Sequence, residues 1–267
     1  MPRILLIVFI LTMALTLLVP LGEVVRISFT DELGAPTLAN YRDVLGAGYF
    51  RNALLQTLAF CLFTSVGAAL LGLPAAWRIG RGGSGAVPLR GFCQANYAFG
   101  GVVYGMLAVA LIGNVGLVPI AEYELFGTEV TRGFVYTTAG LVVAYAGFQI
   151  PRCALLLAQA VEKLDPDLLR ASRTLGARPA QTAFLVAVPL LGGAIVNATV
   201  STFLISIASF GVALLVTRSF PIFGMLVFKE FVGFANFGTA CAMAVSLAVA
   251  AFATAGAMRR LASGGVY

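Results

Sequence analysis

The chain has 267 residues, of which 60% are hydrophobic and only 10% are charged. A water-soluble domain carries about a quarter charged residues, so this composition excludes a soluble protein and indicates a polytopic membrane protein. The chain contains no histidine, which excludes histidine metal sites, histidine proton relays and Ser-His catalysis. The formal charge of +6 is explained by the basic residues of membrane loops and gives no reason to expect a nucleic-acid partner.

Apolar stretches of the length that crosses a bilayer, about 20 residues, alternate with polar segments. They predict six transmembrane helices, at about 4–27, 52–78, 92–118, 133–157, 183–217 and 234–258. The first stretch has no small-residue cleavage site after it and is predicted to be an uncleaved helix. The fifth is too long for one straight crossing, so breaks are expected at Pro189 and Gly192-Gly193. The predicted fold is an all-α integral membrane protein with a single domain over 1–267.

The polar segments predict an outer loop with a short surface helix at 24–51, a Gly-rich basic turn at 78–90 and an outer loop at 219–233. Between the third and fourth helices an acidic loop carries Glu122, Glu124 and Glu129. This loop could attract a cation, although a topological role or contact with a partner explains it better. The four cysteines, Cys61, Cys93, Cys153 and Cys241, lie singly in apolar stretches and are predicted to be packing residues.

The basic residues predict the orientation of the chain. Eleven lie on the side of Arg3, the 78–90 turn, the segment 152–178 and Arg259-Arg260, and six on the other. The positive-inside rule places the basic side, and with it both termini, in the cytoplasm.

The cytoplasmic segment between the fourth and fifth helices, 158–182, carries signals for a short capped helix. Asp165 is a predicted N-cap and Pro166 fits the first helical position, where its missing N–H costs nothing. Gly176 occupies the position of a C′ glycine in the left-handed conformation. The pattern therefore predicts a water-exposed helix between two hydrophobic segments.

The spacing within 165–189 is more specific than its caps. Arg170-Ala171-Ser172 is followed after three residues by Gly176, and after nine more by Val186-Ala187-Val188-Pro189. This pattern resembles the E-A-A-x3-G-x9-I-x-L-P loop of binding-protein-dependent ABC importer permeases, and implies a type I ABC importer permease-like fold. The similarity covers most of the chain, at Leu164-Asp165-Pro166, Thr174-Leu175-Gly176-Ala177, Asn40-Tyr41, Asn52, Thr57 and Phe210-Gly211.

Two residues depart from the family pattern. Arg170 stands where the family has an acid, and Ser172 stands where it has a second alanine. If the usual glutamate contacts the ATPase, either the partner compensates for the reversed charge or the loop couples by shape. Alternatively, position 170 lies on a solvated face and the substitution is neutral.

The resemblance also implies partners in a bacterial inner membrane: two ATP-binding subunits, a second permease (paralogue or copy), an extracytoplasmic solute-binding protein and membrane lipid. ATP and Mg²⁺ are expected in the partner subunits and no cofactor in this chain, which is not expected to be an enzyme. Its only lysines, Lys163 and Lys229, lie outside any G-x4-G-K-[ST] loop. The residues implied in coupling are Asp165, Leu168, Leu169, Arg170, Ala171, Ser172, Gly176 and Pro189.

Polar side chains within the predicted helices are candidates for lining a path, because they are costly against lipid. They are Asn114, Gln149, Asn197, Ser201 and Ser206. The alternative role for the serines is hydrogen bonding between helices. No acid or base is predicted at mid-membrane depth, which argues against a proton-coupled carrier. The favoured function is ATP-driven import of a small solute, polyamine-like or phosphonate-like; the alternative is a secondary carrier or channel subunit not coupled to ATP.

Overall fold

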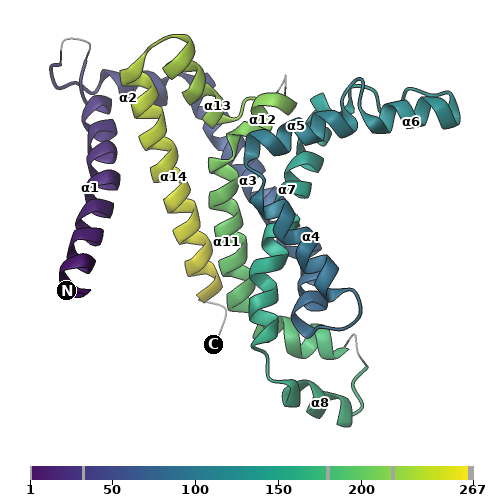
Figure 1. Cartoon of the computed structure of the whole chain (residues 1–267). Coiled ribbons are helices and arrows are strands. Elements are labelled where there is room, and N and C mark those ends of the chain that lie inside the picture. The colour runs from purple at the N-terminus through teal and green to yellow at the C-terminus, as the bar shows by residue number, and fades with distance from the viewer. Residues whose placement is uncertain (1, 32–33, 179–180, 218–219, 264–267) are drawn as a thin grey trace. The chain divides into compact units, whose positions relative to one another are not determined.

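The computed structural model describes residues 2–31, 34–178, 181–217 and 220–263. The regular structure of these residues is helical, apart from one isolated bridge between Thr30 and Pro36, which confirms the all-α class (Figure 1). Five helices are long and apolar enough to span a membrane, or six if one bent helix pair counts as a span. By internal contacts the chain forms two compact units, 1–56 with 221–250 and 57–220 with 251–267. The single-domain organisation stays a prediction, as do both cytoplasmic termini.

The first unit contains α1 (Pro2–Ser28), α2 (Ala39–Gly46), the start of α3 (Gly48–Arg81), α13 (Phe223–Phe228), the π-helix η3 (Lys229–Gly233) and α14 (Phe237–Ser263) as far as Ala250. Its core joins α2, α3, α13 and α14 through Val44, Ala53, Phe223, Leu226, Ala242 and Met243. The short surface helix expected in the first outer loop is confirmed as α2. The predicted outer loop 219–233 is partly helical and buries Phe223 in this core.

Asn40 and Tyr41 join the end of α1 to α2 within the first unit. The Asn40 amide donates to the carbonyls of Ser28 and Thr30, at 3.1 and 3.0 Å, and the Tyr41 and Ser28 hydroxyls are 2.8 Å apart. A Cβ on Gly238 would lie 2.9 Å from the Asn40 amide nitrogen. These two residues of the family-like pattern therefore hold a turn together.

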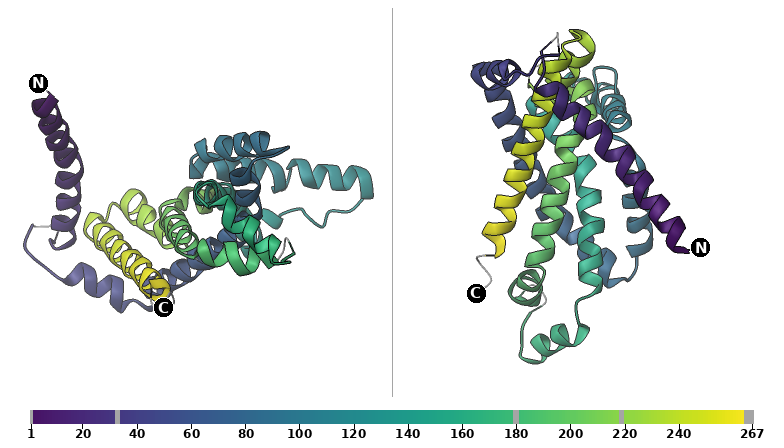
Figure 2. Two further views of the ribbon diagram at one scale, coloured as in Figure 1. Left: turned by 90° about the horizontal axis from the view of Figure 1, so that it is seen from below. Right: turned by 90° about the vertical axis from the view of Figure 1, so that its left-hand side faces the viewer.

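The second unit contains the rest of α3, then α4 (Ala86–Ala98), α5 (Gly101–Ile112), α6 (Leu117–Phe126), the 3₁₀ turn η1 (Phe134–Tyr136) and α7 (Thr138–Glu162). It continues with α8 (Pro166–Thr174), the π-helix η2 (Thr182–Ala187), α10 (Val188–Leu190), α11 (Gly192–Ala208) and α12 (Phe210–Val216). Helix α7 packs against α4, α11 and α12, while α12 lies along α5 (Figures 1 and 2). Helix α7 continues through Pro151, which is buried. The core includes Ala68, Ala76, Cys93, Cys153, Leu157 and Ala198.

The third predicted helix, 92–118, is wrong as a continuous element. The chain leaves the helical conformation at Phe99, with ψ 127°, and Gly100, and again after Gly113. It then forms α6 where an acidic loop was expected. The mostly apolar composition from 97 to 120 conceals these breaks, because they involve glycines whose conformation hydropathy does not report.

The long fifth segment breaks where Pro189 and the glycine pair predicted. Residues Thr182–Leu190 and Gly192–Ala208 are separated by a bend of 66°. A second break at Ser209, between α11 and α12, was not predicted. Arg218, counted among the outer basic residues, lies outside the described residues. The four cysteines are free and buried.

Helices α3 and α7 approach closely because α3 has glycines on the contact face. A Cβ on Gly80 would lie 2.7 Å from the Val161 Cβ and 2.8 Å from the Ala158 carbonyl oxygen. By contrast, a Cβ on Gly67, in the same helix, would meet nothing within 4 Å.

Gly80→Ala is therefore expected to lower the free energy of unfolding by about 1–3 kcal/mol, because the added methyl group must separate the two helices. Gly67→Ala is the matched control and should be neutral or stabilising, since alanine favours a helix over glycine. Denaturation of the purified protein in mixed micelles measures both. Equal stability of the two variants would contradict the close packing at Gly80.

Candidate functional site

Helix α8 is capped as the sequence predicted. The Asp165 carboxylate accepts a hydrogen bond of 2.8 Å from the Asp167 amide, and Pro166 occupies the first turn. At the other end Gly176 has φ +86°, and its amide donates to the Arg173 carbonyl at 3.0 Å. The Ala177 amide donates to the Ser172 carbonyl at 3.2 Å, so the end is a complete Schellman motif. The conformation of Gly176 is the one that other residues rarely adopt.

The two faces of α8 have different environments. Leu168, Ala171 and Leu175 recur at the i, i+3, i+7 spacing of one helix face. All three are exposed, Leu168 by 49% and Leu175 by 88%. Leu169 and Ser172 lie on the half-buried face, and α8 contacts η2. One face of α8 thus packs against η2, and its apolar face is exposed.

The two departures from the family pattern lie on opposite sides of this division. The Arg170 guanidinium pairs with the Asp167 carboxylate one turn earlier, at 2.8 Å, and both side chains are more than three-quarters exposed. The Ser172 hydroxyl donates to the Leu169 carbonyl and lies 2.9 Å from the Thr182 hydroxyl, within hydrogen-bond distance. Because Thr182 is buried in η2, the additional hydroxyl at position 172 connects α8 to the base of the fifth helical segment.

The α3–α4 turn holds the junction between α7 and α8. Arg90 of α4 forms an ion pair with Glu162, the last residue of α7. Arg81 donates to the Leu164 carbonyl at 3.3 Å and lies over the Trp77 ring. Two arginines of the basic turn are therefore engaged by the segment that leads directly into α8.

Two of the predicted path residues share a groove in the second unit. Asn197 and Ser201, one helical turn apart on α11, face Gln159 and Lys163 of α7 and its C-cap. The groove has a volume of about 260 Å³. Pro189, by contrast, lies on the other side of the 66° bend, in α10.

Gln149, Ser206 and Asn114 lie apart from this groove. Gln149 and Ser206 are buried, where the Gln149 amide donates to the Thr64 hydroxyl at 3.2 Å and the Ser206 and Ser65 hydroxyls are 3.4 Å apart. This arrangement fits hydrogen bonding between α3, α7 and α11. Asn114 lies at the α5–α6 break, in a separate pocket that includes Glu124 and Glu129.

A buried basic residue, Arg152, was not foreseen as part of the helical core. The positive-inside count places Arg152 among the cytoplasmic basic residues, yet it lies within α7 and is 5% exposed. Its guanidinium donates to the carbonyls of Phe148, Tyr97 and Phe99, at 2.8, 2.9 and 2.7 Å, and lies over the Phe148 ring. It thus satisfies carbonyls left open by the α4–α5 break, a favourable position for a cation at a helix C-terminus. The sequence signal for this buried role is the position of Arg152 inside the predicted helix 133–157.

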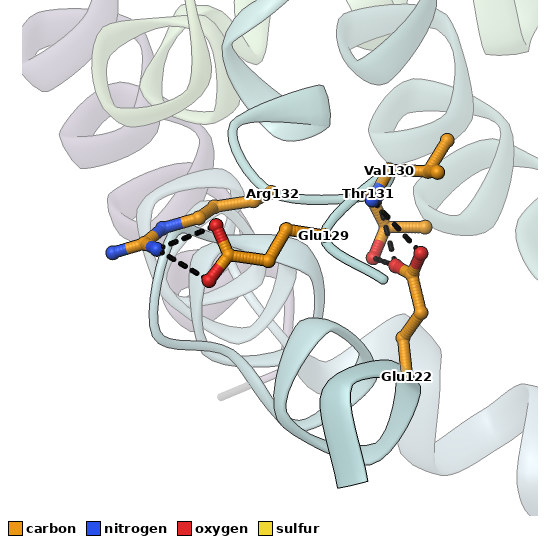
Figure 3. Close-up of polar contacts among 5 residues, drawn as sticks. All are labelled: Glu122, Glu129, Val130, Thr131 and Arg132. Carbon is orange, nitrogen blue, oxygen red and sulfur yellow. Dashed lines mark hydrogen bonds and ion pairs between the residues drawn. The ribbon is translucent and has the colours of Figure 1, made fainter. Parts of the chain in front are cut away.

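Two acidic residues, Glu122 of α6 and Glu129 of the loop that follows, make contacts within the chain (Figure 3). The Glu122 carboxylate accepts hydrogen bonds from the amides of Val130 and Thr131, at 2.8 and 2.9 Å, and from the Thr128 and Thr131 hydroxyls. Glu129 and Arg132 form an ion pair in which one guanidinium nitrogen donates to both carboxylate oxygens, each at 2.8 Å. Two of the three acids thus hold the loop, which weakens the idea that the loop gathers cations.

Glu122→Ala is expected to increase trypsin cleavage after Arg132 several-fold, because the substitution removes the four hydrogen bonds from Thr128, Val130 and Thr131 to the Glu122 carboxylate. Glu124→Ala, in the same helix, removes an equal charge and should leave the cleavage rate unchanged. Limited proteolysis followed by mass spectrometry measures both rates. Equal cleavage of the two variants would show that Glu122 does not order the loop.

The five or six helices that are long and apolar enough to span a membrane define an α-helical multi-pass membrane protein. The structure resembles a bacterial ABC transporter involved in alginate import, with a TM-score of 0.81 at 14% identity over 99% of this chain and 96% of that one; this shows the fold. No family model matches the chain. It is 31% identical over 173 residues to the molybdenum transport system permease protein ModB of Azotobacter vinelandii, covering 63% of this chain and 74% of ModB.

It is also 29% identical over 217 residues to the inner membrane ABC transporter permease protein YdcU of Escherichia coli K12, covering 76% of this chain and 68% of YdcU. The chain belongs to the ABC transporter permeases. It is a multi-pass inner-membrane protein that acts as a translocation subunit.

Proposed function

We propose that this permease serves an ATP-driven importer, coupled to two separate ATP-binding subunits through residues 165–189. The observation that carries the proposal is the exposed apolar face of α8, formed by Leu168, Ala171 and Leu175. An uncovered apolar helix face in water fits a groove on a partner protein. Capping at both ends lets α8 move as a rigid body when that partner moves.

The proposal assigns ATP and Mg²⁺ to the partners and includes a second permease, paralogue or copy, and an extracytoplasmic solute-binding protein. Neither Lys163 nor Lys229 stands in a phosphate-binding loop, so the energy comes from another chain. One solved structure of similar fold is a transporter in complex with a substrate-bound periplasmic protein. In this proposal both termini and α8 are cytoplasmic.

The substrate is a small solute. Relatives are named for trehalose, molybdenum, 2-aminoethylphosphonate and sulfate, and a phosphonate-like solute fits this range better than a polyamine does. Asn197 and Ser201 line the path in this proposal, while Gln149 and Ser206 hold helices together. A secondary carrier or channel would need no ATPase, and co-purification of the chain with an ATPase distinguishes the two.

The coupling route runs from α8 to η2 through Ser172 and Thr182. Their hydroxyls are 2.9 Å apart, and η2 leads through Pro189 and the 66° bend into α11, which carries Asn197 and Ser201. A displacement of α8 is therefore passed to the helix that lines the groove. The Arg90–Glu162 pair connects the end of α7, which leads into α8, to α4.

Gly176→Val is expected to reduce ATP-driven uptake at least tenfold while the protein still accumulates in the membrane. The reason is that valine cannot easily take φ +86°, so the Schellman end of α8 is lost. Gly127→Val is the matched control, because Gly127 is a left-handed cap of α6 at φ +66°, outside the proposed coupling segment. Uptake unchanged by Gly176→Val would contradict the role of α8.

Ser172→Ala and Thr182→Val should each weaken the stimulation of ATPase activity by the solute-loaded binding protein, with basal activity retained. Because both substitutions remove the same Ser172–Thr182 hydrogen bond, their effects in the double variant should be non-additive by about 0.5–1.5 kcal/mol. Thr174→Ala is the control, since the Thr174 hydroxyl donates to the Ala171 carbonyl within α8. Fully additive effects would contradict a coupling role for the Ser172–Thr182 bond.

A further inference from the structure

The groove between α7 and α11 is lined by polar groups and one charged side chain. Its polar groups are an amide on each side (Gln159 and Asn197), a hydroxyl (Ser201) and the ammonium of Lys163, and Leu156, Ala160, Ala194 and Ala198 form the apolar remainder. Both amides and the hydroxyl can donate or accept hydrogen bonds, whereas the ammonium can only donate them. The asymmetry of the groove is therefore its charge: among the residues that the structure describes, its lining has one ammonium and no carboxylate.

The charge of Lys163 is not neutralised by the acids that are near it in sequence. Glu162 pairs with Arg90 and lines a different pocket with Gln94. Asp165 accepts from the Asp167 amide, and Asp167 pairs with Arg170. Lys163 has no ion-pair partner among the residues that the structure describes.

We propose that this groove is the cytoplasmic part of the translocation path, and that Lys163 makes it select small anions, such as an oxyanion or a phosphonate. The inference rests on the proposed transport function and adds the sign of the substrate's charge. A volume of about 260 Å³ accommodates a small solute. A single exposed cation raises the local concentration of anions without binding them tightly, as release into the cytoplasm requires.

A polyamine is disfavoured by the same geometry. A polycation leaving through the groove would pass the ammonium of Lys163 with no carboxylate in the groove to offset the repulsion. Lys229, the other lysine of the chain, lies in η3 of the first unit. Removing its charge therefore serves as a matched control for removing that of Lys163.

The test compares two thiol reagents, the anionic sulfonatoethyl and the cationic trimethylammonioethyl methanethiosulfonates, in inside-out vesicles that contain the whole transporter. A reporter thiol is introduced by Ser201→Cys and, independently, by Asn197→Cys; the native cysteines are buried, and the unsubstituted transporter gives the background. The ratio of the two rates reports the local potential. Lys163→Gln should lower the preference for the anionic reagent by a factor of roughly three to ten, whereas Lys163→Arg and Lys229→Gln should leave it unchanged.

An unchanged ratio in Lys163→Gln, at either reporter thiol, would overturn the assignment of charge selection to Lys163. Reporter thiols that react with neither reagent in the assembled transporter would overturn the groove as part of the path. Failure of the proposed function would give a different result. The preference for the anionic reagent would still depend on Lys163, but the chain would co-purify with no ATPase. Such a result would leave an anion-selective groove that works without ATP.

Discussion

The complementary ends of α8 are the constraint on which the rest of the account depends. A nine-residue helix is too short to persist in water by itself, so its open amides and carbonyls must be satisfied locally. Asp165 satisfies the first turn and Gly176 completes the last. With both ends closed, the half-buried face of α8 can be fixed to η2 while the apolar face remains free for a partner.

The same requirement for satisfied backbone groups explains the interrupted helices of the second unit. Where α4 stops before α5, the carbonyls of Tyr97 and Phe99 lose their helical hydrogen-bond partners, and an unpaired carbonyl against apolar surroundings is costly. The buried guanidinium of Arg152 donates hydrogen bonds to both carbonyls. Among the described residues no carboxylate is a hydrogen-bond partner of Arg152. The charge of Arg152 is thus used to hold the backbone of a break, whereas that of Lys163 is left available in the groove.

How far the sequence predicts the molecule depends on the kind of signal. The caps of α8 were predictable because Asp165, Pro166 and Gly176 act on their own backbone within a few residues. The bend near Pro189 was predictable for the same reason. The breaks at Phe99 and Ser209 were not, because apolar composition continues through them. Nor could spacing separate Asn197, which faces a groove, from Ser206, which is buried: the neighbouring helix decides that, and it is distant in sequence.

The central claim is that α8 is the surface on which an ATP-binding subunit acts. It is tested most directly by placing a photoreactive phenylalanine analogue at Leu168 or Leu175, which are exposed, and irradiating native membranes. The account predicts cross-links from both positions to an ATP-binding subunit, and none from Leu125 of α6, whose exposure of 74% lies between theirs. Cross-links to lipid or to other chains alone, with the ATP-binding subunit absent from the products, would contradict it.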